Sequence, residues 1–207
     1  MKINPQIYRE YDIRGVVDKD LTPDIVRVLG KGIGTHMANL GKKQLVAGRD
    51  GRLSSKAFRD ALIEGLLSTG CDVVDIGVCP TPVYYFSVFH LDKDGGVMVT
   101  GSHNPPEFNG FKVSVGKSTI FGEEIQNLGR LIEKGGFASG HGRLSEAEII
   151  RPYQDYVKRN IKLGRKMKVV IDSGNGTGGV VAAPLLRELG CEVEELYSEI
   201  DGRFPSH

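Results

Sequence analysis

The sequence predicts an α/β protein that contains the same folding unit twice. Residues 42–77 read as a strand, a polar glycine-rich turn, a helix and a second strand. Residues 167–197 repeat this order, and in both copies the helix ends at a glycine followed by a cysteine. The composition suits a packed core, because 40% of the 207 residues are hydrophobic and 26% are charged. We therefore expect two α/β domains.

The helix of each copy has a start, an apolar face and an end that the sequence marks. Ser54 or Ser55 is the expected N-cap of the first helix, and Gly70 closes it. The second helix closes in the same way before Gly190. The residues expected on the inward faces are Ala57, Leu62, Leu66 and Leu67 in the first helix and Leu185, Leu186 and Leu189 in the second.

The residues between the two copies complete the first domain. The apolar stretch GGVMV at 95–99 predicts a buried strand. A helix at 148–161 leads into the second domain, so we place the boundary between residues 147 and 148. The other elements expected here are a helix near 80–91, a partner strand near 110–115, a helix near 122–134 and a surface loop at 135–143. The side chains expected to pack between the domains are Ile149, Ile150, Tyr153, Tyr156, Val157 and Ile161.

Residues 99–112, VTGSHNPPEFNGFK, form the candidate site, because they gather a serine, a histidine and a lysine around one tight turn. Gly101 permits a sharp bend and the prolines that follow prevent a helix, so we expect Ser102 to be held outward on a stiff loop. This loop follows a predicted buried strand, and α/β folds bind ligands at such strand ends.

Two kinds of chemistry fit Ser102. A serine hydroxyl becomes a nucleophile when a neighbouring group assists it, and His103 and Lys112 are the nearby candidates. An outward serine beside cations also suits a phosphoryl group, whose charge of about −1.5 to −2 those cations would offset. Serine, asparagine, glycine and proline are also the ordinary residues of turns, so a plain bend is the alternative for each residue taken alone.

The string TGSHNPPEFNGFK at 100–112 resembles the active-site loop of the α-D-phosphohexomutases, and in particular that of the bacterial phosphomannomutase/phosphoglucomutase branch. Gly101 and Phe111 favour this branch over the related phosphoglucosamine mutases. The resemblance implies three-layer α/β/α domains with mixed sheets, the first at 1–147 and an incomplete second at 148–207. Further segments that resemble the family, in the expected order, are REYDIRG at 9–15, GRDGRLS at 48–54, PTP at 80–82, KVVIDSGNG at 168–176 and EIDGRFPSH at 199–207.

The resemblance implies a role for each matching residue. Ser102 would be a phosphoserine that donates its phosphoryl group to a hexose monophosphate, mannose or glucose, through a 1,6-bisphosphate intermediate. Phosphate would thereby move between O6 and O1 of the sugar. Lys112 would transfer the proton of the sugar hydroxyl, while Arg14 and His103 would supply positive charge. The residues expected to contact substrate are Tyr11, Asn104 and Asn109.

The resemblance also implies Mg²⁺ as cofactor and glucose 1,6-bisphosphate as activator. In the family the metal is held by the phosphoserine and by three aspartates on a DGDGDR-like loop. This sequence contains no such loop, so Ser102, through its phosphate, is the one metal ligand expected from this chain. We expect the chain on its own to show no mutase turnover.

Two other classes of function remain open on the residues alone. Gly174, Gly176 and Gly179 form GxGxxG between a predicted strand and helix, with acidic residues about 20 positions on, as in a nicotinamide-dinucleotide-binding oxidoreductase domain. Against this hypothesis, the corresponding turn of the first copy, GRDGR, has no such fingerprint. The other class is a non-catalytic sugar-phosphate binding module, which would need no transferable phosphate on Ser102.

Two further motifs have structural explanations. VGKST at 115–119 imitates the end of a phosphate-binding P-loop, but the required first glycine would fall at Phe111, so we predict a turn. The charged residues of GRDGR, which are Arg49, Asp50 and Arg52, are expected to brace the candidate loop rather than to contact substrate.

Composition excludes several other functions. A net charge of +1 argues against a nucleic-acid partner, and no run approaches the roughly 18 apolar residues of a membrane span. The first residues lack the apolar centre of a signal peptide, so we expect a cytoplasmic protein with no membrane partner. Cys71, Cys79 and Cys191 have no metal-binding spacing and are expected to be reduced. The sequence leaves the oligomeric state open.

Overall fold

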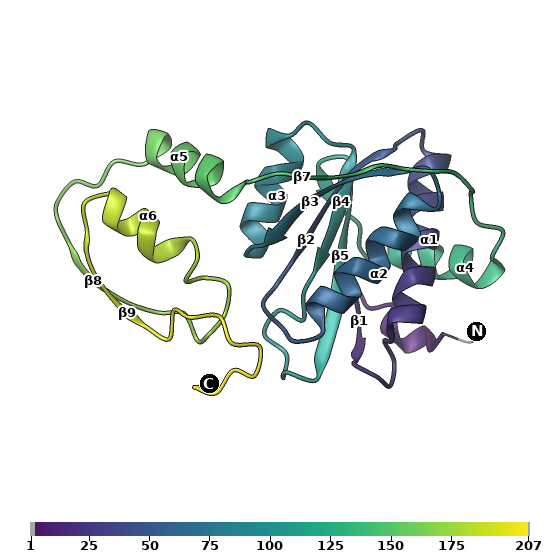
Figure 1. The fold of residues 1–207 in the computed structure, drawn as a ribbon, viewed down its shortest axis with the longest axis horizontal. Helices are drawn as coiled ribbons and strands as arrows, with labels where there is room; N and C mark the ends of the chain where they lie inside the picture. Colours follow the sequence, from purple (N-terminus) through teal and green to yellow (C-terminus); the bar gives the residue numbers. More distant parts are fainter. Residues whose placement is uncertain (1–2, 207) are drawn as a thin grey trace.

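A mixed β-sheet forms the centre of the first domain. The computed structural model describes residues 3–206, and Figure 1 shows a larger amino-terminal unit joined by one helix to a smaller unit. The sheet has the order β1-β5-β4-β2-β3-β7, with the short β6 paired to β5. Pairs β2–β3, β2–β4 and β3–β7 are parallel, whereas β1–β5, β4–β5 and β5–β6 are antiparallel. The strand bounds are Ile13–Val16 (β1), Gln44–Arg49 (β2), Asp72–Val78 (β3), Gly95–Val99 (β4), Phe108–Val115 (β5), Ser118–Thr119 (β6) and Leu144–Glu146 (β7).

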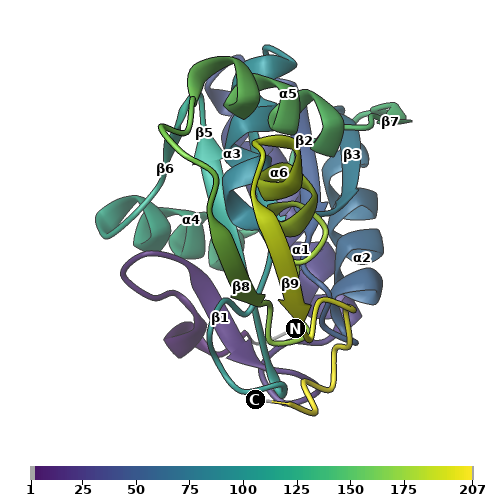
Figure 2. The same cartoon turned by 90° about the vertical axis from the view of Figure 1, so that its left-hand side faces the viewer.

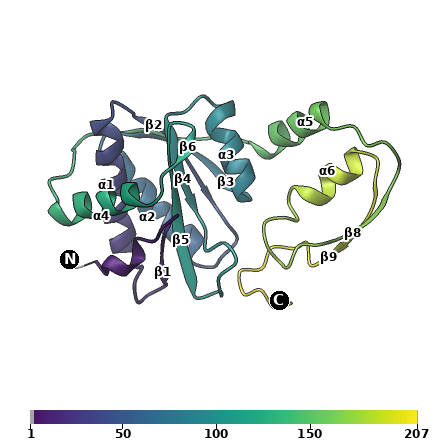
Figure 3. The same ribbon diagram turned by 180° about the vertical axis from the view of Figure 1, so that it is seen from behind.

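Helices cover both faces of this sheet, as the predicted three-layer fold requires. Side chains of a strand alternate between faces, and along β2 Leu45 and Ala47 join one apolar cluster whereas Val46 joins another. The first cluster lies under α1 (Pro23–Asn39), α2 (Ser55–Leu67) and α4 (Glu123–Lys134), and the second lies under α3 (Thr81–His90). Figures 1 and 3 show α3 on one side of the sheet and α1, α2 and α4 on the other.

The two predicted copies both form a parallel strand–helix–strand unit. In the first copy β2 and β3 are paired and joined through α2; in the second, β8 (Lys168–Asp172) and β9 (Glu192–Leu196) are paired and joined through α6 (Ala182–Glu188). Gly70 and Gly190 follow the two helices with φ of 86° and 95°, in the left-handed region that glycine adopts most readily. The predicted repeat and its helix ends are confirmed.

Two details of α2 differ from the prediction. Ala57 is exposed, and Phe58, which is 2% exposed, takes the inward position and lies 6.2 Å from the Phe111 ring. Ser54 occupies the N-cap position, but its side chain makes no capping hydrogen bond. The prediction was therefore wrong by one residue at the start of α2. Two apolar residues, Ala57 and Phe58, are adjacent there, and the larger one is buried.

Helix α1 and strand β1 lie outside the elements predicted from the sequence. The helix begins with Pro23 after Thr22, whose side-chain oxygen accepts a hydrogen bond from the Ile25 amide. Glycines inside the helix, including Gly30 and Gly32, lower its intrinsic helix propensity. Tertiary packing compensates, because these glycines allow α2 and α4 to lie close to α1.

Helix α5 (Ile150–Asn160) joins the two units and packs on α3. The Phe86 ring lies 5.4 Å from the rings of both Tyr153 and Tyr156, and Ile149 is buried in the cluster under α3. The predicted packing between domains is therefore confirmed for Ile149 and Tyr153 and in part for Tyr156, whose ring contacts Phe86 although it is 50% exposed; Ile161 is 46% exposed. Figure 2 shows β8, β9 and α6 beside α5. No helix within residues 3–206 is both long enough and apolar enough to cross a membrane.

Candidate active site

Ser102 lies where the chain leaves the sheet after β4. The Thr100 amide donates to the Gly110 carbonyl oxygen at 2.9 Å, which extends the pairing with β5 by one residue. Ser102 then adopts a φ of 54°, a left-handed conformation that non-glycine residues rarely take, and its amide donates to Thr100 Oγ1 at 2.9 Å. The side chain is exposed, with Oγ 3.3 Å from His103 Nδ1. The loop geometry that was predicted around Ser102 is confirmed.

A buried carboxylate holds two of the predicted cations together beside this loop. The register Ile13↔Phe111 and Arg14↔Gly110 places Asp12 next to Lys112 across β1 and β5. One oxygen, Asp12 Oδ2, lies 2.5 Å from the Arg14 guanidinium and 3.4 Å from Lys112 Nζ. The apolar neighbours Ile13 and Phe111 point to the opposite face of the sheet, into the core.

Asp12 is a site residue that the sequence analysis missed. It is 5% exposed, and its other carboxylate oxygen, Oδ1, has no hydrogen-bond partner among the described residues. The alternation of REYDIRG along a strand could have revealed it, because residues two apart share a face. The two cations and the one buried carboxylate together leave a net positive charge at this place on β1 and β5.

The expected substrate residues do not share one environment. Tyr11 is 68% exposed and free to contact a ligand. Asn104 donates from Nδ2 to the Gly101 carbonyl at 3.0 Å, within the Ser102 loop. Asn109 is fully buried, and its Nδ2 donates to the hydroxyls of Ser54 and Ser55 at 2.8 and 3.0 Å. Asn109 thus braces the start of α2, and its expected contact with substrate stays a prediction.

The predicted bracing role of GRDGR is confirmed for Asp50 and Arg52. Asp50 accepts hydrogen bonds from the Gly101 amide at 3.2 Å and from the Ser55 hydroxyl at 2.5 Å. Arg52 is 3% exposed and donates to four carbonyl oxygens of residues 102–108. Its Nε lies 3.3 Å from Asp50 Oδ2, so the two charges of the pair balance where water is excluded.

The described residues do not by themselves make a metal site. Nowhere in residues 3–206 do three histidine, cysteine, aspartate or glutamate side chains converge as a metal would need. Ser102, once phosphorylated, could offer phosphate oxygens, which suit a hard cation such as Mg²⁺. The oxygen ligands that would complete such a site are not supplied by this part of the chain.

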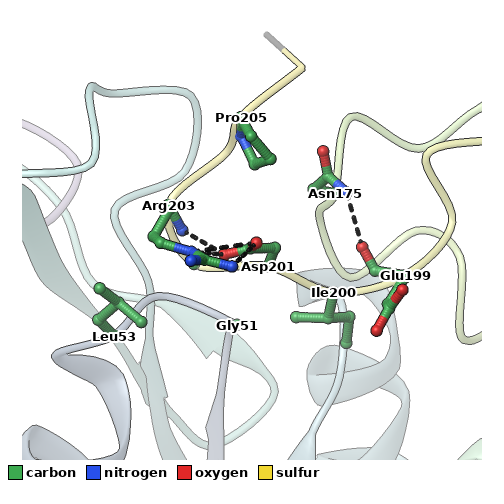
Figure 4. Close-up of a pocket in the computed structure, with 9 residues that line it drawn as sticks. Gly51, Leu53, Asn175, Glu199, Ile200, Asp201, Arg203 and Pro205 are labelled. Atoms are coloured by element: carbon green, nitrogen blue, oxygen red, sulfur yellow. Dashed lines mark hydrogen bonds and ion pairs between the residues drawn. The ribbon is translucent and has the colours of Figure 1, made fainter.

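The GxGxxG turn at 174–179 forms hydrogen bonds and close contacts with residues 197–199 of the same chain. The amide of Asn175 donates to the Tyr197 carbonyl oxygen at 2.8 Å, and Asn175 Nδ2 donates to the Glu199 carbonyl oxygen at 3.0 Å. A Cβ on Gly179 would lie 2.3 Å from the Ser198 carbonyl oxygen, so this glycine is required for close backbone packing. A cleft of about 770 Å³ lies between this region and residues 51–53, with segment 199–205 along it (Figure 4).

The three cysteines are buried and make no disulfide within the described residues. Burial raises the pKa of the Cys79 thiol to about 12, with the Asp75 charge adding to the effect. Burial likewise raises the pKa of Cys71. Thiols of this kind stay protonated and unreactive at neutral pH.

Comparisons with known proteins show the family of the chain. The family model for phosphoglucomutase/phosphomannomutase alpha/beta/alpha domain I matches residues 5–138, and the model for domain II matches residues 151–207. A Pseudomonas aeruginosa phosphomannomutase/phosphoglucomutase is 45% identical over 201 residues, which cover 97% of this chain and 43% of the relative. A Neisseria gonorrhoeae phosphoglucomutase is 42% identical over 207 residues, which cover 99% of this chain and 45% of the relative.

A solved structure is also similar. The crystal structure of a phosphoglucomutase/phosphomannomutase family protein from Burkholderia thailandensis has a TM-score of 0.96 and 41% identity, covering all of this chain and 47% of that one. The chain thus spans somewhat less than half the length of the relatives it matches. With both family models matched in order across most of its residues, the chain belongs to the phosphoglucomutase/phosphomannomutase family.

Proposed function

We propose that this chain carries the phosphoserine half of a phosphohexomutase active site. The single observation that carries the proposal is the exposed Ser102, held in a left-handed conformation on the loop that joins β4 to β5, the strand that carries Lys112 and pairs with β1, which carries Arg14. The substrate class is hexose phosphate, with mannose or glucose as the sugar. Relatives 42–45% identical are named phosphomannomutase/phosphoglucomutase and phosphoglucomutase, which supports this class.

The proposed reaction moves a phosphoryl group between Ser102 and the sugar. The bond from phosphorus to Ser102 Oγ breaks as a bond to O1 or O6 of a hexose monophosphate forms. Lys112 gives its ammonium proton to the departing Ser102 Oγ and takes the sugar hydroxyl proton in its place. The resulting 1,6-bisphosphate turns over and returns its other phosphate to Ser102, so that phosphate has moved between O6 and O1. Arg14 and His103 offset charge on the phosphoryl oxygens, which is the main contribution proteins make to such transfers.

Asp12 positions the Arg14 and Lys112 side chains for this mechanism. By pairing with both Arg14 and Lys112, the carboxylate keeps the two cations on the same face of β1 and β5. Tyr11 is the next residue along the chain and would contact the sugar; its 68% exposure supports this role. Asn104 acts through the loop that it braces, and Asn109 acts through its contacts with Ser54 and Ser55.

The remaining parts of the proposal concern the longer protein. Mg²⁺ would neutralise phosphate charge with ligands supplied in part from beyond this chain, and glucose 1,6-bisphosphate would load Ser102. We place the boundary between the two domains at residues 147 and 148, in the stretch between the two matched family models. A cytoplasmic location suits three reduced cysteines.

The two alternative functions have less support. A dinucleotide pyrophosphate would need the GxGxxG backbone that the chain's own residues 197–199 contact. A non-catalytic binding module would have no need of a serine held in a strained, outward conformation.

Phosphate mapping on the full-length protein tests the proposal. After incubation with glucose 1,6-bisphosphate, peptide mapping of residues 99–112 should place a phosphoryl group on Ser102. The variant Ser102→Ala should lose both this group and hexose-phosphate interconversion, whereas Lys112→Met should keep the phosphoserine and transfer it about 10²- to 10⁴-fold more slowly. Ser118→Ala, at an exposed serine on β6, is the matched control and should behave as the unaltered protein. Undiminished turnover in Ser102→Ala would overturn the proposed function.

A further inference from the structure

Arg52 makes an unusually complete set of contacts with the Ser102 loop. Its Nη1 donates to the carbonyl oxygens of Pro105 and Phe108 at 2.7 and 2.9 Å. Its Nη2 donates to the carbonyl oxygens of Ser102 and Asn104 at 3.0 and 2.6 Å. The guanidinium is a rigid planar fork, so four simultaneous bonds fix the relative positions of both sides of the loop.

The loop needs such a constraint because its key residue is strained. Ser102 has a φ of 54°, which costs a non-glycine residue free energy and persists only where surrounding contacts enforce it. Gly101 allows Arg52 to come close, since a Cβ on Gly101 would lie 2.5 Å from Arg52 Cζ. The buried Arg52 guanidinium therefore helps to hold Ser102 in its strained conformation.

A segment of the second domain covers the Arg52 guanidinium. The Phe204 ring lies with its centroid 5.3 Å from Arg52 Cζ, within the range of a cation–π contact. Phe204 itself has a φ of 50°, so its backbone is also held in the left-handed region. The residues just before Phe204 contact the turn at residues 51–53, which follows β2.

Two glycines, Gly51 and Gly202, allow the backbones of the two domains to touch. A Cβ on Gly202 would lie 2.6 Å from both the Gly51 carbonyl oxygen and the Leu53 amide nitrogen. A Cβ on Gly51 would lie 2.3 Å from Ile200 Cγ2. Figure 4 shows Asp201 and Arg203 above Gly51 and Leu53, with Ile200 beside Gly51. Segment 199–205 is thus seated directly on the turn that carries Arg52.

We infer that Arg52 is a positioning residue for Ser102 and that Phe204 secures it, so that the seating of segment 199–205 controls the conformation of the serine loop. Movement of this segment would uncover Arg52 and loosen four carbonyl contacts at once. As a statement about catalysis the inference rests on the proposed function, because it makes phosphoryl transfer from Ser102 depend on contacts between the two domains. The structural part, that Phe204 controls order in residues 100–108, stands independently.

Hydrogen exchange of residues 100–108 in the full-length protein tests the inference. Phe204→Ala removes only the cover of Arg52 and should speed amide exchange in this loop about tenfold, the size expected for loss of a partly desolvated cation–π contact. Arg52→Lys, which cannot form the fork, should speed it further. Phe204→Trp keeps an aromatic face over Arg52 and should restore the slow exchange.

The matched control is a second cation–π pair of the same geometry. Lys117 Nζ lies 5.3 Å from the Phe89 ring centroid, near the turn that follows β5. Phe89→Ala should leave exchange of residues 100–108 unchanged. Equal exchange in the unaltered protein and in both Phe204→Ala and Arg52→Lys would overturn the inference.

Phosphoryl transfer measured on the same variants separates the inference from the proposed function. Phe204→Ala should transfer phosphate from Ser102 about tenfold more slowly, mainly through kcat, because the loop is misplaced while substrate contacts remain. A loop that loosens in Phe204→Ala while transfer is unchanged would overturn the link to catalysis. Failure of the unaltered protein to phosphorylate Ser102 would overturn the proposed function, and the exchange experiment would still decide the role of Phe204.

Discussion

The conformation of Ser102 depends on residues that are buried rather than exposed. Gly101 leaves the room that Arg52 occupies, and Asp50 accepts a hydrogen bond from the Gly101 amide. Arg52 in turn holds the Ser102 carbonyl oxygen. Each of these residues acts on the serine through the backbone of its loop. Substitutions in this group should therefore change the loop before they change the sheet beneath it.

Gly101→Ala tests this dependence at one methyl group. The new Cβ would lie 2.5 Å from Arg52 Cζ and 2.8 Å from the Phe108 carbonyl oxygen, so the guanidinium must leave its carbonyl contacts. We expect a loss of about 1–3 kcal/mol in the free energy of unfolding, measured by urea denaturation, together with faster exchange in the loop. Gly178→Ala, where no atom lies within 4 Å of the new Cβ, is the control. A Gly101→Ala variant as stable as this control would contradict the prediction.

His36, at the end of α1, should make the domain less stable in mild acid. Burial lowers the pKa of His36 from its ordinary value of 6.5, and the Glu124 charge opposes this only in part. The unfolded chain therefore binds a proton near pH 6.5 before the folded protein does, so stability is lost as pH falls from 6.5 towards the folded pKa.

The measurement is the free energy of unfolding across this pH range in the unaltered protein and in His36→Asn. The difference in slope should not exceed about 1.4 kcal/mol per pH unit, the limit for one proton. His141→Asn, at an exposed position in loop 135–143, should keep the slope of the unaltered protein. Parallel pH profiles for the unaltered protein and His36→Asn would rule the explanation out.

At the scale of elements, helix α2 is positioned by glycine contacts as much as by its apolar face. A Cβ on Gly65 would lie 2.3 Å from the Arg27 carbonyl oxygen and 2.9 Å from Gly30 Cα, both in α1. A Cβ on Gly30 would lie 2.4 Å from the Leu62 carbonyl oxygen. The backbones of α1 and α2 thus approach each other directly, and the helix pair completes one layer of the domain.

Gly65→Ala has two opposite effects on stability: it raises the helix propensity of α2 and it creates a steric clash with α1. Alanine inside a helix is favoured over glycine by about 1 kcal/mol, but the clash is with backbone atoms that cannot rotate away. We expect a net loss of about 2 kcal/mol or more, seen as a lower urea midpoint with an unchanged helical far-ultraviolet spectrum at zero urea. Gly164→Ala, in open space, should change stability little. A stabilised Gly65→Ala variant would show that α1 and α2 separate at little cost.

Most elements could be predicted from the sequence because their signals are local. The strand at 95–99 and the helices at 80–91 and 122–134 follow from apolar runs and turn residues within a few positions. Helix α1 was missed because its glycines serve contacts with α2 and α4, which no local pattern reveals. For the same reason Asp12 and the four carbonyl contacts of Arg52 emerge only when distant segments are brought together.

At the scale of the whole molecule, the two domains bury very different amounts of apolar surface. The first has two extensive clusters on either face of its sheet. In the second, β8 and β9 alternate exposed and half-buried residues, with Val170 64% and Leu196 40% exposed. The buried apolar residues there are Ile149, Val181, Ala183 and Cys191, and the first two belong to the cluster under α3. The repeat in sequence thus forms the same topology twice, with unequal burial in this chain.

Unequal burial predicts that the chain of 207 residues unfolds in two steps. With rising urea, amides of β8 and β9 should lose protection at a lower concentration than those of β2 and β4, because fewer apolar contacts hold them. Phe86→Ala should widen the gap between the two midpoints, since the Phe86 ring packs on Tyr153 and Tyr156 of α5.

The amides of the loop at 100–108 show whether unfolding of the second domain also disorders the site. The loop belongs to the first domain, yet Phe204 of the second domain covers the arginine that holds it. Its amides should therefore lose protection together with β8 and β9 at the lower midpoint, while β4, from which the loop emerges, stays protected. Loop amides that follow β4 instead would show that Arg52 holds Ser102 without help from segment 199–205. Two domains that unfold at one common midpoint would contradict the premise of unequal stability itself.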